Sequence, residues 1–225
     1  MDLISTEHGQ ALQLFVADEV RPPSGLYLPD VIRKISERYG FAIVPTNYET
    51  VMKEGAKYKD GRFVTEGRTI AIKDLGFFVD GVLAVTWNTD DAEVVLDDLI
   101  VWATQNYGFR EPRTTLPRRF VSSVVVGFDV ELSSALTAFD ELREGFASAI
   151  KKGHGIEPEI NASRITFAAD PTKLLRSEPP FEFNIERRGG RPFSENRYFS
   201  SATLTTASHL DLLEAFERRL RIKRN

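Results

Sequence analysis

The two halves of this 225-residue chain predict the same order of secondary-structure elements. Residues 10–107 and residues 119–221 each predict a strand, a helix, three strands and a second helix, although the residues themselves hardly repeat. This order constrains the fold strongly, because successive strands joined by short connections usually pair as neighbours. We predict an α+β fold in which two pseudo-repeated βαβββα units form a curved, mostly antiparallel sheet backed by helices.

In the first half, apolar residues at period two predict a strand over residues 10–20, preceded by a tail. A helix is expected over residues 28–39 because apolar residues recur every four positions and Gly40 follows. Asp80-Gly81 between two apolar runs predicts a β-hairpin, and a helix should follow over residues 90–107. A short strand is expected over residues 41–45, and the polar segment 47–68 is predicted to be a surface excursion or a small hairpin.

In the second half, residues 120–132 alternate clearly enough to predict a strand, and residues 134–152 predict an amphipathic helix. Three more strands are expected over residues 163–169, 180–187 and 197–205, with a closing helix from residue 208. Two prolines in the polar segment 111–117 mark the boundary between the halves. We therefore expect units over residues 1–112 and 113–225, either as two domains or as one fused domain with a shared sheet.

The apolar faces of these elements predict the core. It should contain Leu14, Val16, Val95, Leu99 and Trp102 in one unit, and Val124, Val126, Phe128, Phe139, Leu142 and Phe146 in the other. In element order the two units resemble the saddle of the TATA-binding proteins, which implies a continuous curved sheet backed by helices. This resemblance concerns the fold and does not imply a function.

The composition excludes several classes of site and gives a default location. The chain has no cysteine, so disulfides, Cys-ligated zinc, iron–sulfur clusters and thiol nucleophiles are excluded. The sequence shows no basic stretch followed by a long apolar run at its N-terminus, and no membrane-length apolar segment. We therefore expect a cytoplasmic protein without membrane association.

No common catalytic or cofactor motif occurs, and we expect neither a cofactor nor a metal. The glycines form neither a dinucleotide fingerprint nor a phosphate loop, and no serine stands in a nucleophile elbow. The histidines at positions 8, 154 and 209 lack metal-ligand spacing. His154 is interpreted as a solvated loop residue and His209 as a polar residue near a helix start.

Charge is distributed unevenly along the chain. Residues 1–112 contain 11 Lys/Arg and 18 Asp/Glu, a net charge of −7, whereas residues 113–225 contain 18 and 15, a net charge of +3. The candidate acidic interaction face is the start of one helix, with Asp90, Asp91, Glu93 and Asp97. The candidate basic contact residues lie in an arginine-glycine loop and at the C-terminus, namely Arg187, Arg188, Arg191, Arg197, Arg218, Arg219, Arg221, Lys223 and Arg224.

These features favour a non-catalytic binding or assembly subunit of a larger complex or of a homo-oligomer, because opposite charges on the two halves could pair between copies or with a partner. One alternative is a nucleic-acid-binding protein in which the arginine loop and the basic terminus contact phosphates and neighbouring aromatic rings stack on bases. The other alternative is a hydrolase or nuclease with a carboxylate site, for which the sequence supplies no assembled set of acids.

Overall fold

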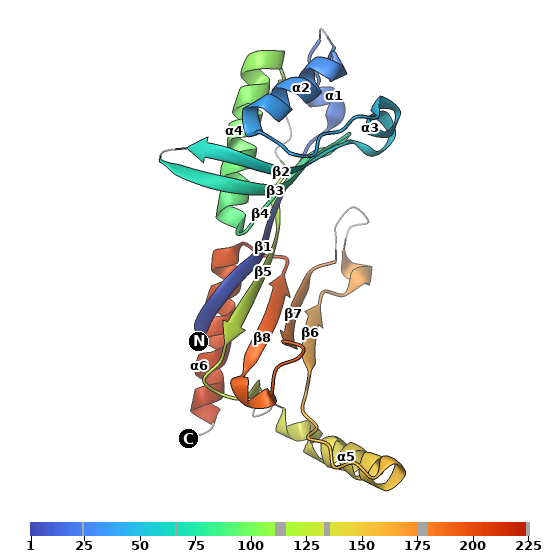
Figure 1. Ribbon diagram of the computed structural model, residues 1–225, viewed down its shortest axis with the longest axis vertical. Helices are drawn as coiled ribbons and strands as arrows, with labels where there is room; N and C mark the ends of the chain where they lie inside the picture. The colour runs from blue at the N-terminus through green and yellow to red at the C-terminus, as the bar shows by residue number, and fades with distance from the viewer. Residues whose placement is uncertain (24, 66, 111–115, 133–135, 175–179, 224–225) are drawn as a thin grey trace. The chain divides into compact units, whose positions relative to one another are not determined.

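The computed structural model describes residues 1–23, 25–65, 67–110, 116–132, 136–174 and 180–223 (Figure 1). Its strands are β1 (Asp2–Leu14), β2 (Ala56–Thr65), β3 (Arg68–Phe78), β4 (Gly81–Thr86), β5 (Arg119–Gly127), β6 (Arg164–Ala168), β7 (Glu182–Arg187) and β8 (Arg197–Ala202). Its α-helices are α1 (Ala17–Val20), α2 (Leu28–Tyr39), α3 (Tyr48–Glu54), α4 (Thr89–Tyr107), α5 (Asp140–His154) and α6 (Thr206–Lys223). The fold is therefore mixed α and β, as predicted.

The described residues form an eight-stranded sheet in the order β2-β3-β4-β1-β5-β8-β7-β6. The hairpins β2–β3, β3–β4, β6–β7 and β7–β8 are antiparallel, and β1 pairs antiparallel with β4. The sheet is open, with β2 and β6 as its edges. Outward from its centre the order is β1-β4-β3-β2 on one side and β5-β8-β7-β6 on the other.

The chain forms two compact units, and each draws on both halves of the sequence. The unit that we call the N-unit contains Thr6–Ser122 and Thr203–Thr206, and the C-unit contains Met1–Ser5, Ser123–Ala202 and Ala207–Asn225. The ranges 1–112 and 113–225 were expected from the repeated order of elements in the sequence, and the division of the chain at that boundary stays a prediction. Compact packing follows different boundaries, because the long strands β1 and β5 each contribute to both units.

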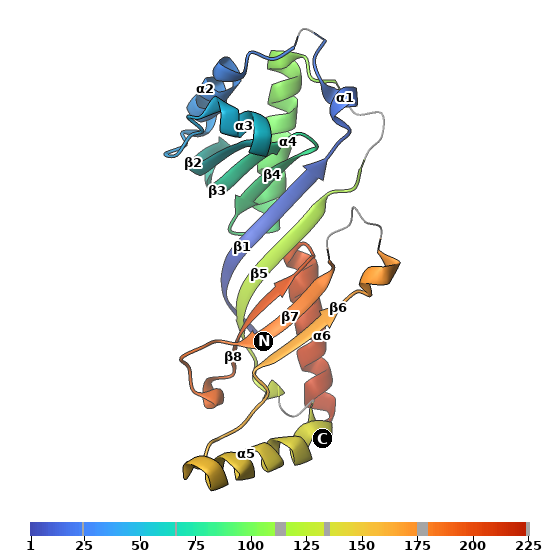
Figure 2. The ribbon, with the colours of Figure 1, turned by 90° about the vertical axis from the view of Figure 1, so that its right-hand side faces the viewer.

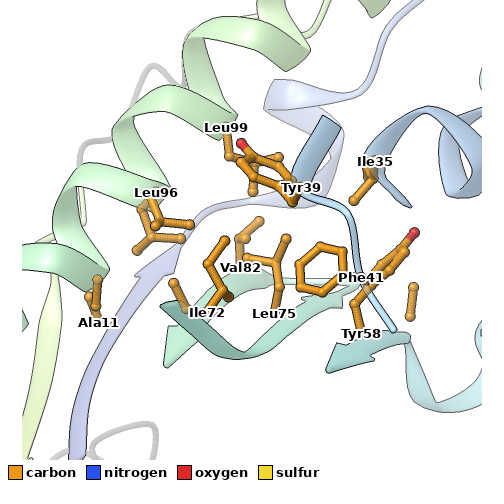
Figure 3. Packing of buried hydrophobic residues seen from close by; sticks show 14 of the residues in the cluster. Ala11, Ile35, Tyr39, Phe41, Tyr58, Ile72, Leu75, Val82, Leu96 and Leu99 are labelled. Carbon is orange, nitrogen blue, oxygen red and sulfur yellow. The ribbon is translucent and has the colours of Figure 1, made fainter. Parts of the chain in front are cut away.

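The N-unit core lies between the sheet and two helices. Ile35 and Tyr39 of α2 and Leu96 and Leu99 of α4 pack with buried residues of β1 to β4, as Figure 3 shows. The prediction is confirmed for Val95 and Leu99, whereas Trp102 packs only partly buried against this core. It is wrong for Val16, which is 46% exposed because β1 ends at Leu14 before this residue is reached.

Local capping explains why the two predicted helices of the N-unit are found with nearly the expected bounds. Gly40 follows α2 and Gly108 follows α4, both in the left-handed conformation that glycine adopts without strain. The side chain of Asn88 accepts a hydrogen bond from the backbone N–H of Asp91 at the start of α4. The hairpin at Asp80-Gly81 is also confirmed, since β3 ends at Phe78 and β4 begins at Gly81.

Three predictions in this half need correction. The predicted tail belongs to β1, which starts at Asp2, and the end of the predicted strand forms α1. Residues 47–68 contain α3, capped by the side chain of Asn47, and the long strand β2. The expected strand over residues 41–45 is reduced to an isolated bridge between Ile43 and Lys59. Polar residues on the exposed side of β2 conceal this strand in the sequence.

The C-unit core forms between β5, β7, β8 and one face of α6. Val124, Val126 and Phe128 are buried as predicted, and Leu213 and Leu220 of α6 pack on them. Tyr198 joins the same cluster, with its ring centroid 5.1 Å from that of Phe128. This core contains no residue of α5, although the sequence predicted that α5 would pack on it. The exposed face of α5 is therefore the candidate site.

Candidate functional site

Helix α5, together with Phe139 directly before it, carries an apolar stripe on the surface of the C-unit. Phe139, Leu142 and Phe146 are 58%, 71% and 55% exposed, and Ala149 is exposed as well. We refer to these four residues as the α5 stripe. Within the described residues no member of α5 is buried, and Figure 2 shows the helix beyond the ends of β6 to β8. Our prediction that Phe139, Leu142 and Phe146 belong to the core is wrong, because helical periodicity identifies an apolar face without showing what covers it.

The helix itself has well-defined ends. Asp140 and Glu141 lie in its first turn, and Lys151 and Lys152 lie in its last, so both ends complement the helix dipole. Gly155 ends it in the left-handed conformation, and the backbone N–H of Gly155 donates to the carbonyl of Lys151 at 2.9 Å. The helix is therefore supported by local capping and presents the α5 stripe on a regular surface.

The charges beside the α5 stripe are arranged by helical spacing. Glu141 and Lys152 are eleven residues apart, which is about three turns, so they lie on the same side of α5 at opposite ends. Two other charged residues have partners close in the chain: Arg143 pairs with Asp140 at 3.1 Å, and Lys151 pairs with Glu157 at 2.8 Å. One flank of the stripe is thus acidic at its start and basic at its end.

The predicted arginine loop folds back onto its own hairpin. Nη1 of Arg187 donates to the carbonyl of Phe193 at 3.0 Å, and its guanidinium lies 4.4 Å from the centroid of the Phe193 ring. Arg191 and Arg197 approach the carboxylate of Glu195 at 3.8 Å and 3.4 Å, while the Arg188 side chain is exposed. The structure brings these arginines together with an acid among them, and their role in binding stays a prediction.

The basic residues at the end of α6 are separated by acids. Arg218 pairs with Glu214 at 3.7 Å, and Arg221 pairs with Glu217 at 3.2 Å and also with Asp129. Arg219 is exposed, Lys223 is the last residue of the helix, and Arg224 lies outside the described residues. These pairs at one turn of spacing leave a less basic surface than the sequence alone indicates.

The acidic start of α4 is also paired with arginines of the N-unit. Asp91 accepts from Arg68 at 2.7 Å, and Arg118 bridges Glu93 and Asp97 at 3.2 Å and 2.5 Å. Asp90 is exposed at the first turn. The four predicted residues do lie together on one helix, and three of them are held in ion pairs, which suits a helix start.

Two of the histidines are placed differently from our interpretation. His209 is fully buried, with Nε2 2.8 Å from the hydroxyl of Ser200, and burial lowers its pKa to about 4. Its ring meets Phe183 edge to face, so it is a core residue and not an exposed polar one. His8 lies in β1, where burial lowers its pKa, whereas His154 is exposed at the end of α5.

The described residues contain no group of three or more His, Cys, Asp or Glu residues able to hold a metal ion. None of the helices formed by these residues combines the length and the apolar character required to cross a bilayer. No model of a known protein family matches the chain, and no curated protein matches it either.

Proposed function

We propose that this protein is a non-catalytic assembly subunit that forms a homodimer through antiparallel pairing of α5 with α5 of a second copy. The observation that carries the proposal is the exposure of Leu142 and Phe146 along one face of a capped helix. Large apolar side chains grouped on one helix face are typical of interaction surfaces. Burying the two stripes against each other would remove both from water.

Charge supports a second copy as the occupant of this surface. In an antiparallel pair related by a twofold axis, Glu141 of each copy would lie beside Lys152 of the other, because both flank the same side of the α5 stripe. The contact would therefore occur twice, with opposite charges each time. In a parallel pair, by contrast, the flank with Glu141 and Lys152 would face the opposite flank of the partner helix, so these two residues would not meet.

The size of α5 limits the strength of the dimer. A helix of 15 residues is about 22 Å long, so one helix pair buries less surface than a standard interface of about 1,600 Å². Phe167 of the edge strand β6 and Ile156 after α5 are also exposed apolar residues of the C-unit that could extend the contact. We expect a dissociation constant on the order of micromolar.

Sedimentation equilibrium of the full chain tests the dimer. Leu142→Glu and Phe146→Glu should each abolish association, and the melting temperature measured well below the dissociation constant should stay that of wild type, since both side chains are exposed in the single chain. Val64→Glu is the matched control, because Val64 is 68% exposed on β2 of the N-unit. A wild-type chain that sediments as a monomer at 100 µM would overturn the proposal, and so would dissociation of the dimer by the Val64 control.

Reversal of charge tests the antiparallel arrangement. Glu141→Lys and Lys152→Glu should each weaken self-association, because each substitution places like charges opposite one another twice. A mixture of the two variants should form a heterodimer in which both contacts again join opposite charges. Native mass spectrometry separates the three species after one variant is isotope-labelled, and a statistical mixture would rule out the proposed pairing.

We also propose that the two βαβββα halves are a structural repeat. The symmetric strand order and the equivalent positions of α4 and α6 after β4 and β8 support it. A repeat predicts that equivalent positions have equivalent contacts, and the first residues of α4 and α6 are one such pair. If the halves are a repeat, substitution of either residue should lower the free energy of unfolding by a similar amount.

A further inference from the structure

A cavity of about 580 Å³ lies entirely within the N-unit. Its wall is formed by α2, α3 and α4 on one side and by β1 to β4 on the other, with Ile35, Leu99, Trp102, Tyr58, Phe77 and Val82 among its lining residues. Cavities of this volume with mainly apolar walls are typical of sites for small molecules. The cavity belongs to a different compact unit from α5 and has no role in the assembly proposed above.

One polar group in this wall has no partner. Tyr58 is 1% exposed, and its hydroxyl makes no hydrogen bond with any described residue. Its ring is fixed by Phe41 and Phe77, whose centroids lie 5.1 Å and 5.9 Å away. Figure 3 shows the hydroxyl directed away from the sheet toward the helix layer. A buried hydroxyl without a hydrogen-bond partner destabilises the folded protein. This indicates that a bound molecule supplies the missing partner.

Three other polar side chains of the lining are already engaged, and those of Arg21 and Thr104 are exposed to solvent. Gln13 donates to the carbonyl of Leu116 at 3.0 Å and accepts from Arg118 at 3.1 Å. The hydroxyl of Tyr107 donates to Asp30 at 3.2 Å, and Arg110 donates to the carbonyl of Arg21. Tyr58 therefore stands out as the group that can select a ligand by hydrogen bonding.

The lining also excludes one class of ligand. Among the described residues it contains Arg21 and Arg110 but no Asp or Glu, so it would repel a cation. Leu26, Met52 and Val79 are lining residues that are also 40%, 74% and 73% exposed, so they mark an apolar mouth open to solvent. A molecule could enter there without opening the core.

We propose that the N-unit cavity binds a largely apolar small molecule that carries no positive charge and has one oxygen that hydrogen-bonds to the hydroxyl of Tyr58. The apolar body of the molecule replaces water along Ile35, Leu99 and Val82, and its oxygen completes the hydrogen bonding of the tyrosine. Ketones, ethers and alcohols of medium length all share this chemistry.

Calorimetric titration of the full chain tests the proposal with three nine-carbon probes. Nonan-2-one carries a carbonyl, 1-nonene has nearly the same shape without an oxygen, and nonylammonium carries a positive charge. We expect nonan-2-one to bind about five to ten times more tightly than 1-nonene, since one hydrogen bond of ordinary strength separates them. Nonylammonium should bind more weakly than nonan-2-one.

Tyr58→Phe provides two opposite readouts. The unliganded variant should melt about 2–4 °C higher than wild type, because an unsatisfied buried hydroxyl has been removed. Its affinity for nonan-2-one should fall below that for 1-nonene, because the buried carbonyl then has no donor, while its affinity for 1-nonene should not change. A variant that melts lower and keeps the preference for the ketone would overturn the role of Tyr58.

The location is tested by filling the cavity. Ala103→Trp, on the α4 side of the lining, should abolish binding of nonan-2-one while the far-ultraviolet circular dichroism stays that of wild type. Val31→Trp on α2 is a second variant in case the first does not fold. Binding that survives in a folded filled variant, or a wild-type chain that binds neither nonan-2-one nor 1-nonene, would overturn the proposal.

Discussion

Thr89 and Thr206 cap each other across 117 positions of the chain. The backbone N–H of Thr89 donates to the hydroxyl oxygen of Thr206 at 3.0 Å, and the backbone N–H of Thr206 donates to the hydroxyl oxygen of Thr89 at 2.7 Å. Both residues are buried, belong to the N-unit and open a helix, α4 or α6. Each hydroxyl thus satisfies a helix-start N–H that would otherwise be buried without a partner.

Substitution of either threonine by valine keeps the shape and removes the acceptor. We expect Thr89→Val and Thr206→Val each to lower the free energy of unfolding by about 1–2 kcal/mol, measured by urea denaturation. The double variant should lose less than the sum of the single variants, because the two hydroxyls act as a pair. Unequal single effects would argue against the structural repeat, and additive effects would argue against reciprocal capping.

Neighbouring acids on α4 should differ sharply in their contribution to stability. Asp98 accepts from Arg38 at 2.6 Å and from the buried hydroxyl of Tyr39 at 2.7 Å, whereas Asp97 is 63% exposed and pairs with Arg118. Asp98→Ala should therefore cost about 2–3 kcal/mol, because it leaves a buried tyrosine hydroxyl unpaired. Asp97→Ala should cost less than about 1 kcal/mol. Equal losses in urea denaturation would contradict this account.

The buried histidine predicts a loss of stability in mild acid. Burial lowers the pKa of His209 from 6.5 to about 4, so the unfolded chain takes up a proton at a higher pH than the folded chain does. The free energy of unfolding should be unaffected by this group above about pH 6.5 and should fall as the pH drops toward 4, by up to about 3 kcal/mol.

His209→Gln isolates this contribution, since glutamine can still bond to Ser200 but does not titrate. Urea denaturation between pH 7 and pH 4.5 should show a shallower pH dependence for the variant than for wild type. His8, whose pKa is also lowered by burial, contributes in the same direction in both proteins and so cancels in the comparison. Parallel curves would show that His209 is not the source of the acid sensitivity.

Substitution of Gly9 tests how closely the backbone of β1 approaches Asn88, the residue before α4. A Cβ atom at Gly9 would lie 2.0 Å from the carbonyl carbon of Asn88, so the backbone would have to move. Gly9→Ala should cost at least about 2 kcal/mol in thermal or urea denaturation. Gly127→Ala is the control, because the nearest heavy atom to its Cβ would be 3.8 Å away on Ile4, and it should change stability little.

The sequence predicts the bounds of an element correctly where the spacing of apolar residues and the signals for the ends of helices or strands agree. Helix α2 has the predicted bounds because four-residue spacing of apolar side chains coincides with a glycine stop, and the Asp80-Gly81 hairpin follows from turn chemistry alone. Strand β2 was missed because its outward residues are polar and lysine-rich. The sequence therefore does not indicate that Tyr58, which lies in that strand, lines the N-unit cavity.

The candidate site could be located in the sequence but not correctly interpreted. The apolar residues of α5 were found by their spacing, and burial was inferred because most amphipathic helices pack on their own domain. No local signal distinguishes a helix that covers its own sheet from one that offers its face to another molecule. The ion pairs Arg197–Glu195 and Arg118–Asp97 could likewise not be predicted from the sequence, because the partners come together only when the chain folds.

The exchange of segments between the N-unit and the C-unit has a consequence for how the protein is synthesised. The first residues of β1 are translated before Ser123, where the rest of the C-unit begins, and the N-unit is completed only when Thr203–Thr206 emerges from the ribosome. The C-unit cannot form before α6 has been made, whereas the buried core of the N-unit lies between Ala11 and Leu99, and the long separation of the C-unit contacts slows folding. A fragment cut at residue 112 would therefore keep the buried core of the N-unit but lack that of the C-unit, and β1 would have an exposed edge without β5 to cover it.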